Sequence, residues 1–128
     1  MEDARIWEYE RELWLGGGEV YRERVADTCV MALPSEPFLF DGKAATAAVE
    51  GTPRWKTVDF ADQVVERPHE GLIVIGYRVR ASHAEAGGAD GRYNALCTST
   101  LMRLAHEEWV VVQHQQTPLG VLVADPDA

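Results

Sequence analysis

The sequence predicts an α+β fold in which three short helices pack on a curved, mainly antiparallel sheet and form a cone-shaped half-barrel. Apolar residues in the first 50 positions recur at helical spacing, whereas those from Trp55 onward mostly alternate with polar residues. Short segments rich in glycine, proline and acidic residues separate the alternating runs, as in hairpin connections. The 128 residues suit one domain, with a core over about 3–118 and a short tail over 119–128.

The first helix is predicted over residues 3–15, with Asp3 as its N-cap and the three glycines at 16–18 as its end. Two apolar pairs one heptad apart, Ile6–Trp7 and Leu13–Trp14, form its buried stripe. We expect the charged residues between them, Glu10 included, to surround this stripe.

Two more helices and one strand are predicted before Trp55. They are a helix over 19–26, a strand over 28–33 that ends at Pro34, and a helix over 43–50 that begins after Asp41. Residues 38–40 form a short apolar piece between the last two. The third helix is rich in alanine, which suggests that it lies close against the sheet.

Four long strands are predicted in the second half of the chain. They cover 56–65, 72–81, 92–104 and 109–118, joined by a turn at 66–71, a hairpin loop at 85–91 and a turn at 105–108. In the second of these strands Arg78 and Arg80 share one face. The opposite face, with Ile73, Ile75, Tyr77 and Val79, is therefore expected to face the core.

The last strand changes from apolar to polar along its length. One face would carry Val110, Val112, His114 and Gln116, and the other Trp109, Val111, Gln113 and Gln115. Either face suits a sheet that is dry at one end and lines a polar pocket at the other, and the pattern does not decide between them. Because residues 109–112 are apolar on both faces, they need cover on both sides, which favours a homodimer.

The composition excludes several classes of partner. The net charge is −9, from 12 basic and 21 acidic residues, so nucleic acid and anionic membranes are not expected partners. No apolar run reaches the roughly 20 residues that span a bilayer, and the acidic start of the chain lacks a signal core, so we expect a cytoplasmic protein. Cys29 and Cys97 are expected to be buried free thiols rather than a disulfide. Neither metal-ligand spacing nor a cofactor motif is present, so no metal or cofactor is expected.

The order of these elements resembles the nuclear transport factor 2 (NTF2)-like superfamily, and more closely its SnoaL-like and ketosteroid-isomerase-like members. The resemblance covers about residues 3–118. It rests on the Trp7/Trp14 helix, the segment 25–27 before the first strand, Asp41–Gly42–Lys43, Trp55, the strand segment 76–79, and residues 109–118. It implies that the cone interior is a pocket, that the outer sheet face forms a homodimer, and that the role is that of an isomerase, a cyclase, a dehydratase or an association domain.

Two residues are candidates for catalysis. His114 could act as an acid or base near neutral pH, or could simply be hydrogen-bonded within the sheet. Tyr77 could donate to a developing oxyanion, or could be a core aromatic residue. Isomerase chemistry also needs a carboxylate beside the substrate. None of Asp27, Asp59 and Asp62 occupies a convincingly buried position, which counts against an isomerase.

Five further residues are candidates for ligand binding. They are Trp14, Met31, Trp55, Thr98 and Gln116. The two tryptophans could wall a pocket for a flat ligand or belong to the core, and Gln116 could orient a ligand or pair with a neighbouring strand or subunit. The leading hypothesis is a SnoaL-like protein that binds a small, partly apolar molecule in the cone. The alternatives are an isomerase, dehydratase or cyclase with His114 as acid or base, and an association module without a ligand.

Overall fold

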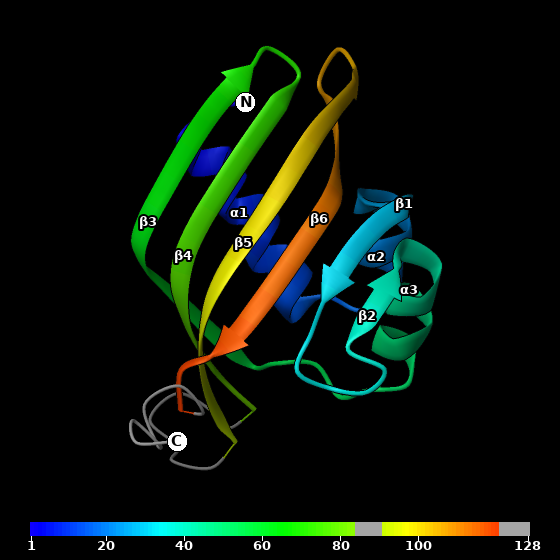
Figure 1. Cartoon of the computed structure of the whole chain (residues 1–128), viewed down its shortest axis with the longest axis vertical. Helices are drawn as coiled ribbons and strands as arrows, with labels where there is room; N and C mark the ends of the chain where they lie inside the picture. Colours follow the sequence, from blue (N-terminus) through cyan, green and yellow to red (C-terminus); the bar gives the residue numbers. More distant parts are fainter. Residues whose placement is uncertain (84–90, 121–128) are drawn as a thin grey trace.

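The structure, a computed structural model, describes residues 1–83 and 91–120. Three helices lie on one face of a six-stranded sheet whose strand order is β2-β1-β6-β5-β4-β3 (Figure 1). The predicted α+β half-barrel is therefore confirmed, and the sheet is not closed. The predicted loop at 85–91 falls almost entirely outside the described residues, as does most of the tail at 119–128.

The helices follow the predicted order. α1 covers Asp3–Leu15, α2 covers Gly18–Arg24 and α3 covers Gly42–Glu50. The predicted N-cap of α3 is confirmed, because the Asp41 carboxylate accepts a hydrogen bond from the Ala44 backbone N–H at 2.8 Å. The predicted N-cap of α1 is wrong by one residue, since Glu2 occupies that position without a side-chain bond.

The first strand, β1, covers Val25–Ala32 and begins earlier than predicted, so α2 ends at Arg24 rather than at residue 26. The reason is tertiary: Val25 is buried and pairs with Val111. β1 runs parallel to β6 (Glu108–Pro118) and antiparallel to the short β2 (Leu39–Asp41), so the apolar piece at 38–40 contributes to a sixth strand.

The remaining strands are long. β3 covers Thr57–His69, β4 covers Leu72–Ser82 and β5 covers Arg92–Ala105. The turn predicted at 66–71 is wrong for most of its length, because β3 continues through Pro68. A proline lacks a backbone N–H but is tolerated there, since β3 is an edge strand of the sheet.

The inner face of the sheet carries the core. Ile73, Ile75, Tyr77 and Val79 of β4 are all buried, as predicted, and pack with residues of α1 and of the neighbouring strands. Cys29 and Cys97 are buried free thiols, also as predicted. Among the described residues, no helix is long and apolar enough to cross a membrane.

A register shift in β6 changes which of its side chains face inward. Ser99 of β5 pairs with His114, and Leu101 pairs with Val111, so one extra residue of β6 lies between the two pairs. Because Ser99 and Leu101 share a face of β5, Val111 and His114 also share a face. Both are buried. The simple alternation that predicted them on opposite faces is therefore wrong.

Candidate functional site

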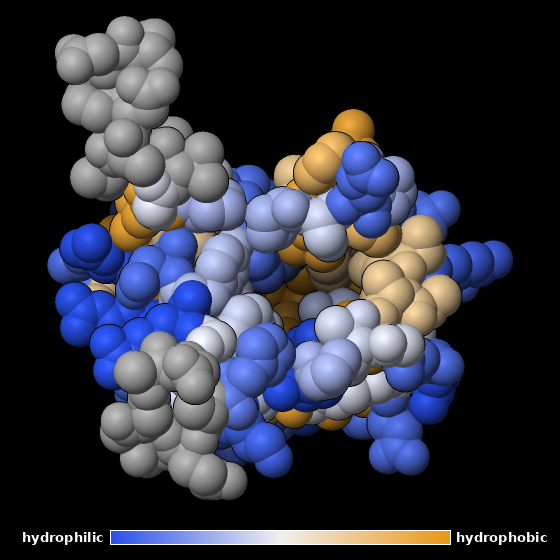
Figure 2. Space-filling view, turned by 90° about the horizontal axis from the view of Figure 1, so that it is seen from below, coloured by the Kyte–Doolittle hydropathy of each residue, from blue (hydrophilic) through white to orange (hydrophobic). Residues whose placement is uncertain are grey.

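A cavity of about 310 Å³ opens between the helices and the inner face of the sheet. Its lining comes from the end of α1, from α2, β1, β2 and α3, from the segments that follow β1 and α3, and from β5 and β6. Figure 2 shows the hollow from below, with hydrophobic residues in its depth. The volume lies at the lower end of the range for small-molecule sites.

The structure brings most of the predicted site residues to this cavity. Trp14, Met31, Trp55, His114 and Gln116 all line it. They come from separate elements, and the fold rather than the sequence spacing places them together.

Two predicted site residues are placed elsewhere. Tyr77 is buried outside the lining, and its hydroxyl accepts a hydrogen bond from Trp14, which lines the cavity. Thr98 lies on the opposite face of the sheet, where its hydroxyl donates to Gln115 Oε1 at 3.0 Å and accepts from Gln113 Nε2 at 3.1 Å. The prediction that Thr98 lines the pocket is wrong, because residues 97 and 98 of a strand point to opposite faces and Cys97 is the buried one.

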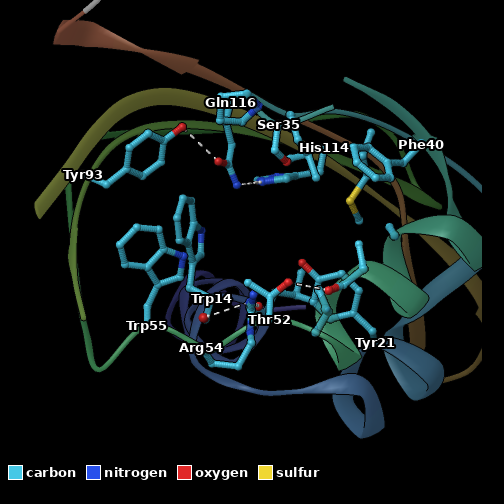
Figure 3. A pocket seen from close by; sticks show the side chains of 17 residues that line it. Trp14, Tyr21, Ser35, Phe40, Thr52, Arg54, Trp55, Tyr93, His114 and Gln116 are labelled. Carbon is cyan, nitrogen blue, oxygen red and sulfur yellow. Dashed lines mark hydrogen bonds between the residues drawn. The ribbon is translucent and has the colours of Figure 1, made fainter. Parts of the chain in front are cut away.

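Aromatic rings form one wall of the cavity. Trp55 stacks on Tyr93 with ring centroids 5.4 Å apart and an interplanar angle of 15°. Trp14 lies 6.2 Å from each of them, measured between ring centroids. Trp55 also stacks on His83, with ring centroids 3.9 Å apart. Such a wall offers flat, apolar surface to a ring-shaped ligand (Figure 3).

A chain of hydrogen bonds leads from the cavity into the core. The Tyr93 hydroxyl donates to Gln116 Oε1 at 3.0 Å, and Gln116 Nε2 lies 3.0 Å from His114 Nε2 (Figure 3). On the other side of the imidazole ring, His114 Nδ1 lies 2.7 Å from the Ser99 hydroxyl. Ser99 in turn donates to Glu10 Oε2 at 2.5 Å.

This chain assigns the tautomer of His114. The Ser99 hydroxyl has one proton and gives it to Glu10, so Ser99 can only accept from His114 Nδ1–H. The other ring nitrogen, Nε2, is then the acceptor for the Gln116 amide. Burial lowers the pKa of His114, and the nearby Glu10 and a backbone bond to Thr98 oppose this shift only in part. The ring is therefore neutral at neutral pH, and its accepting nitrogen lies on the cavity side of the chain.

Glu10 is the functional residue that sequence reasoning missed. Only 1% of its surface is exposed, and Oε2 accepts from Ser99 and from the Tyr77 hydroxyl, the latter at 2.5 Å. Tyr77 accepts from the Trp14 indole N–H at 2.9 Å. Within the described part of the chain, Glu10 Oε1 has no hydrogen-bond partner.

A signal for this burial was present in the sequence. Glu10 lies four residues after Ile6 and four before Trp14, so it falls inside the apolar stripe of α1 rather than beside it. A charged residue in the middle of such a stripe must be buried with hydrogen-bond donors around it.

Burial and the neighbouring Glu10 raise the pKa of Tyr77 well above its ordinary value, so the Tyr77 hydroxyl keeps its proton and remains a donor to Glu10.

Arg54 lies at the opposite side of the cavity from His114 and Gln116 (Figure 3). Its Nε donates to the carbonyl of Gly16 at 2.6 Å, and its Nη2 donates to those of Leu13 and Trp14 at 2.7 and 3.0 Å. These are the free carbonyls at the end of α1, where a cation is favoured by the helix dipole. The bonds hold the guanidinium in a fixed orientation.

The described residues contain no cluster of three His, Cys, Asp or Glu side chains arranged to hold a metal ion. The side chains at and behind the cavity provide an aromatic wall, a fixed guanidinium, an amide and a neutral imidazole connected to a buried carboxyl group.

Comparison with known proteins supports the fold. No protein-family model matches the sequence, and no curated protein does. Among solved structures, an NTF2-like protein of unknown function in nutrient uptake from Rhodospirillum rubrum is similar, with a TM-score of 0.74, 17% identity, and coverage of 92% of this chain and 98% of that one.

Two other similar structures bear different descriptions. A candidate ketosteroid isomerase from Parabacteroides distasonis has a TM-score of 0.74 and 16% identity, with 91% of this chain and 87% of that chain covered. The association domain of C. elegans CaMKII has a TM-score of 0.70 and 12% identity, with 89% and 91% covered. The three share an architecture and carry different descriptions. The chain therefore has the NTF2-like α+β cone fold.

Proposed function

We propose that the chain binds a small, partly apolar, flat molecule in the cavity of its cone. The observation that carries this proposal is the cavity itself: a volume of about 310 Å³ with a stacked aromatic wall and a few convergent polar groups. Such a combination is typical of small-molecule sites. The polar groups, Arg54 at one side and Gln116 at the other, would orient the ligand.

Two alanines of α3 provide a matched test. Both are exposed, but Ala48 lines the cavity and its neighbour Ala47 does not. We expect Ala48→Trp to fill the mouth of the cavity and Ala47→Trp to leave it open. Both variants change the same helix by the same side chain.

The measurement is the rise in melting temperature on adding bicyclic aromatic compounds, because a ligand that binds only the folded state stabilises it by mass action. The native chain and Ala47→Trp should respond, and Ala48→Trp should not. An equal response from Ala48→Trp would place the binding elsewhere. No response from the native chain to a broad set of such compounds would contradict the proposal.

A second candidate function is acid–base catalysis by His114, as in an isomerase, a dehydratase or a cyclase. It is favoured by the chain from His114 through Ser99 to Glu10, which holds Nδ1 protonated and leaves Nε2 as the basic nitrogen. A substrate proton would move to Nε2, and Glu10, whose Oε2 lies 3.6 Å from Nδ1, would stabilise the imidazolium. Gln116 must first release Nε2. The similar Parabacteroides structure, described as a candidate ketosteroid isomerase, is consistent with this candidate.

The test of this candidate is the rate at which a β,γ-unsaturated ketone is isomerised, followed by absorbance. We expect the rate to rise with pH through the lowered pKa of His114 and to level off at neutral pH. His114→Gln should abolish the reaction while the variant still binds the ketone. A rate unchanged in His114→Gln would exclude the histidine as the base.

The outer face of the sheet is where we propose a homodimer to form. Leu96 and Met102 of β5 are 45% and 38% exposed on this face, beside a polar group of threonines and glutamines. The similar structures include association domains, which is consistent with assembly through the sheet. Light scattering should give twice the mass of the chain at micromolar concentration, and Leu96→Glu should shift it to the monomer.

The free thiols agree with a cytoplasmic location, which is part of the same proposal.

A further inference from the structure

We propose that the natural ligand of the cavity is an aromatic carboxylate, a flat apolar ring system whose anionic group pairs with Arg54. This inference names the ligand class of the site and rests on the proposed function. It is carried by the distribution of charge around the cavity and by the way in which Arg54 is held.

The lining of the cavity has a charge opposite to that of the chain. The sequence has 21 acidic and 12 basic residues, yet none of the 17 lining side chains is an aspartate or a glutamate. Burial lowers the pKa of His114 and raises the pKa values of Tyr21 and Tyr93, so these three lining groups are neutral near pH 7. Arg54 is then the only charged side chain among the described lining residues.

Arg54 is already oriented before any ligand enters. Its Nε and Nη2 are bound to three backbone carbonyls of the α1 terminus, and its guanidinium carbon lies 5.6 Å from the ring centroid of Tyr21. Those bonds involve Nε and Nη2, and the guanidinium also lies within hydrogen-bonding reach of the Tyr21 hydroxyl. Within residues 1–83 and 91–120, no carboxylate lies within ion-pair distance of this guanidinium. A half-buried cation without an anionic partner favours an anionic ligand.

The opposite side of the cavity is polar without being charged. Gln116 has two amide hydrogens and two accepting lone pairs, and its contacts with His114 and Tyr93 use one of each. It can therefore bind one neutral substituent of the ligand, such as a hydroxyl or a carbonyl group. Glu10 lies behind this side, with Oε2 3.6 Å from His114 Nδ1, which disfavours an anion there. The ligand carboxylate is thus expected at Arg54, with its ring against Trp14, Trp55 and Tyr93 (Figure 3).

The test compares two ligands of the same shape, 2-naphthoate and 2-naphthamide, by isothermal titration calorimetry at pH 7.5. The first carries the carboxylate and the second replaces it with a neutral amide. We expect the carboxylate to bind the native chain about tenfold more tightly or better, because hydrogen bonds to charged groups are stronger than those between neutral ones.

A pair of variants at Thr52 tests the location without disturbing Arg54. Thr52 lines the cavity on the same side, and its hydroxyl donates only to the exposed Ala48 carbonyl at the end of α3. Thr52→Glu places a competing carboxylate there, and Thr52→Gln is its neutral control. We expect Thr52→Glu to weaken 2-naphthoate about tenfold or more and to leave 2-naphthamide unchanged. Thr52→Gln should affect neither by that much.

The outcomes separate this inference from the proposed function. If both compounds bind the native chain equally, or the amide binds better, the cavity binds ligands but the carboxylate preference is refuted. If 2-naphthoate is preferred but Thr52→Glu does not weaken it, the anionic site is not at Arg54 and the inference fails. If neither compound binds, the inference fails, and the melting-temperature screen with a broad set of bicyclic aromatic compounds decides the proposed function separately.

Discussion

The Tyr77 hydroxyl connects α1 to the sheet, and its removal should be unusually costly for a Tyr→Phe substitution. It accepts the Trp14 indole N–H at 2.9 Å and donates to Glu10 Oε2 at 2.5 Å, and all three side chains are buried. Tyr77→Phe removes both bonds with almost no change of shape. Water has no ready access to replace them.

The magnitude follows from the two partners that remain. A buried indole N–H without an acceptor costs about 1–3 kcal/mol, and Glu10 loses one of the two donors on Oε2 at about 1 kcal/mol. The free energy of unfolding should fall by about 2–4 kcal/mol. With a urea m-value of about 2 kcal/mol/M, the midpoint should move down by about 1–2 M.

The assay is urea unfolding of the native chain, of Tyr77→Phe and of Tyr93→Phe. Tyr93 carries the same hydroxyl, but it is half-buried and its partner Gln116 lines the cavity, where water can replace the bond. Tyr93→Phe should therefore cost no more than about 1 kcal/mol. Equal costs for the two variants, at unchanged m-values, would refute the reasoning that the buried chain secures α1.

Three further predictions concern other parts of the molecule. Burial lowers the pKa of His114 in the folded state, so the unfolded chain takes up a proton near pH 6.5 before the folded chain does. The free energy of unfolding should therefore fall as the pH drops below about 6.5, and it should fall by less in His114→Gln. Urea unfolding at several pH values measures both. Burial raises the pKa of the Cys29 thiol to about 12, and the side chains of both Cys29 and Cys97 are buried. Ellman's reagent at pH 8 should therefore modify neither cysteine until denaturant is added. Rapid labelling of the native chain would contradict this burial. A Cβ at Gly42 would lie 1.9 Å from the Ala26 carbonyl oxygen, so Gly42→Ala should lower the free energy of unfolding by about 3 kcal/mol. A Cβ at Gly17 meets nothing within 4 Å, so the free energy of unfolding of Gly17→Ala should stay within about 0.5 kcal/mol of that of the native chain.

Local patterns predicted the elements well where neighbouring residues decide them. Asp41 caps α3 as expected, and the alternation in β4 correctly assigned Tyr77 to the core face. Five of the seven candidate site residues line the cavity, since the polar end of β6 and the aromatic residues were visible in the sequence. Their placement in one cavity depended on the resemblance to a known fold.

The errors arose where distant contacts decide the structure. The start of β1 at Val25 depends on its parallel pairing with β6, which lies more than 80 residues further along the chain. The extra residue in β6 reverses the side on which His114 lies relative to Val110, and a residue-by-residue alternation cannot reveal it. The charge of Glu10 favours a surface position when α1 is considered alone. Its hydrogen-bond partners Ser99 and Tyr77 come from strands, so the pattern of the helix does not reveal them.

The order of strands in the sheet has a consequence for how the chain folds during synthesis. β6 is the last of the described strands in the sequence, yet it lies between β1 and β5 and joins β2 and β1 to β5, β4 and β3. On the ribosome, the first half of the chain must therefore wait with unpaired strand edges until residue 118 has emerged. A chain that stops before β6 would leave two separate sheets with hydrophobic faces exposed, a state that favours aggregation.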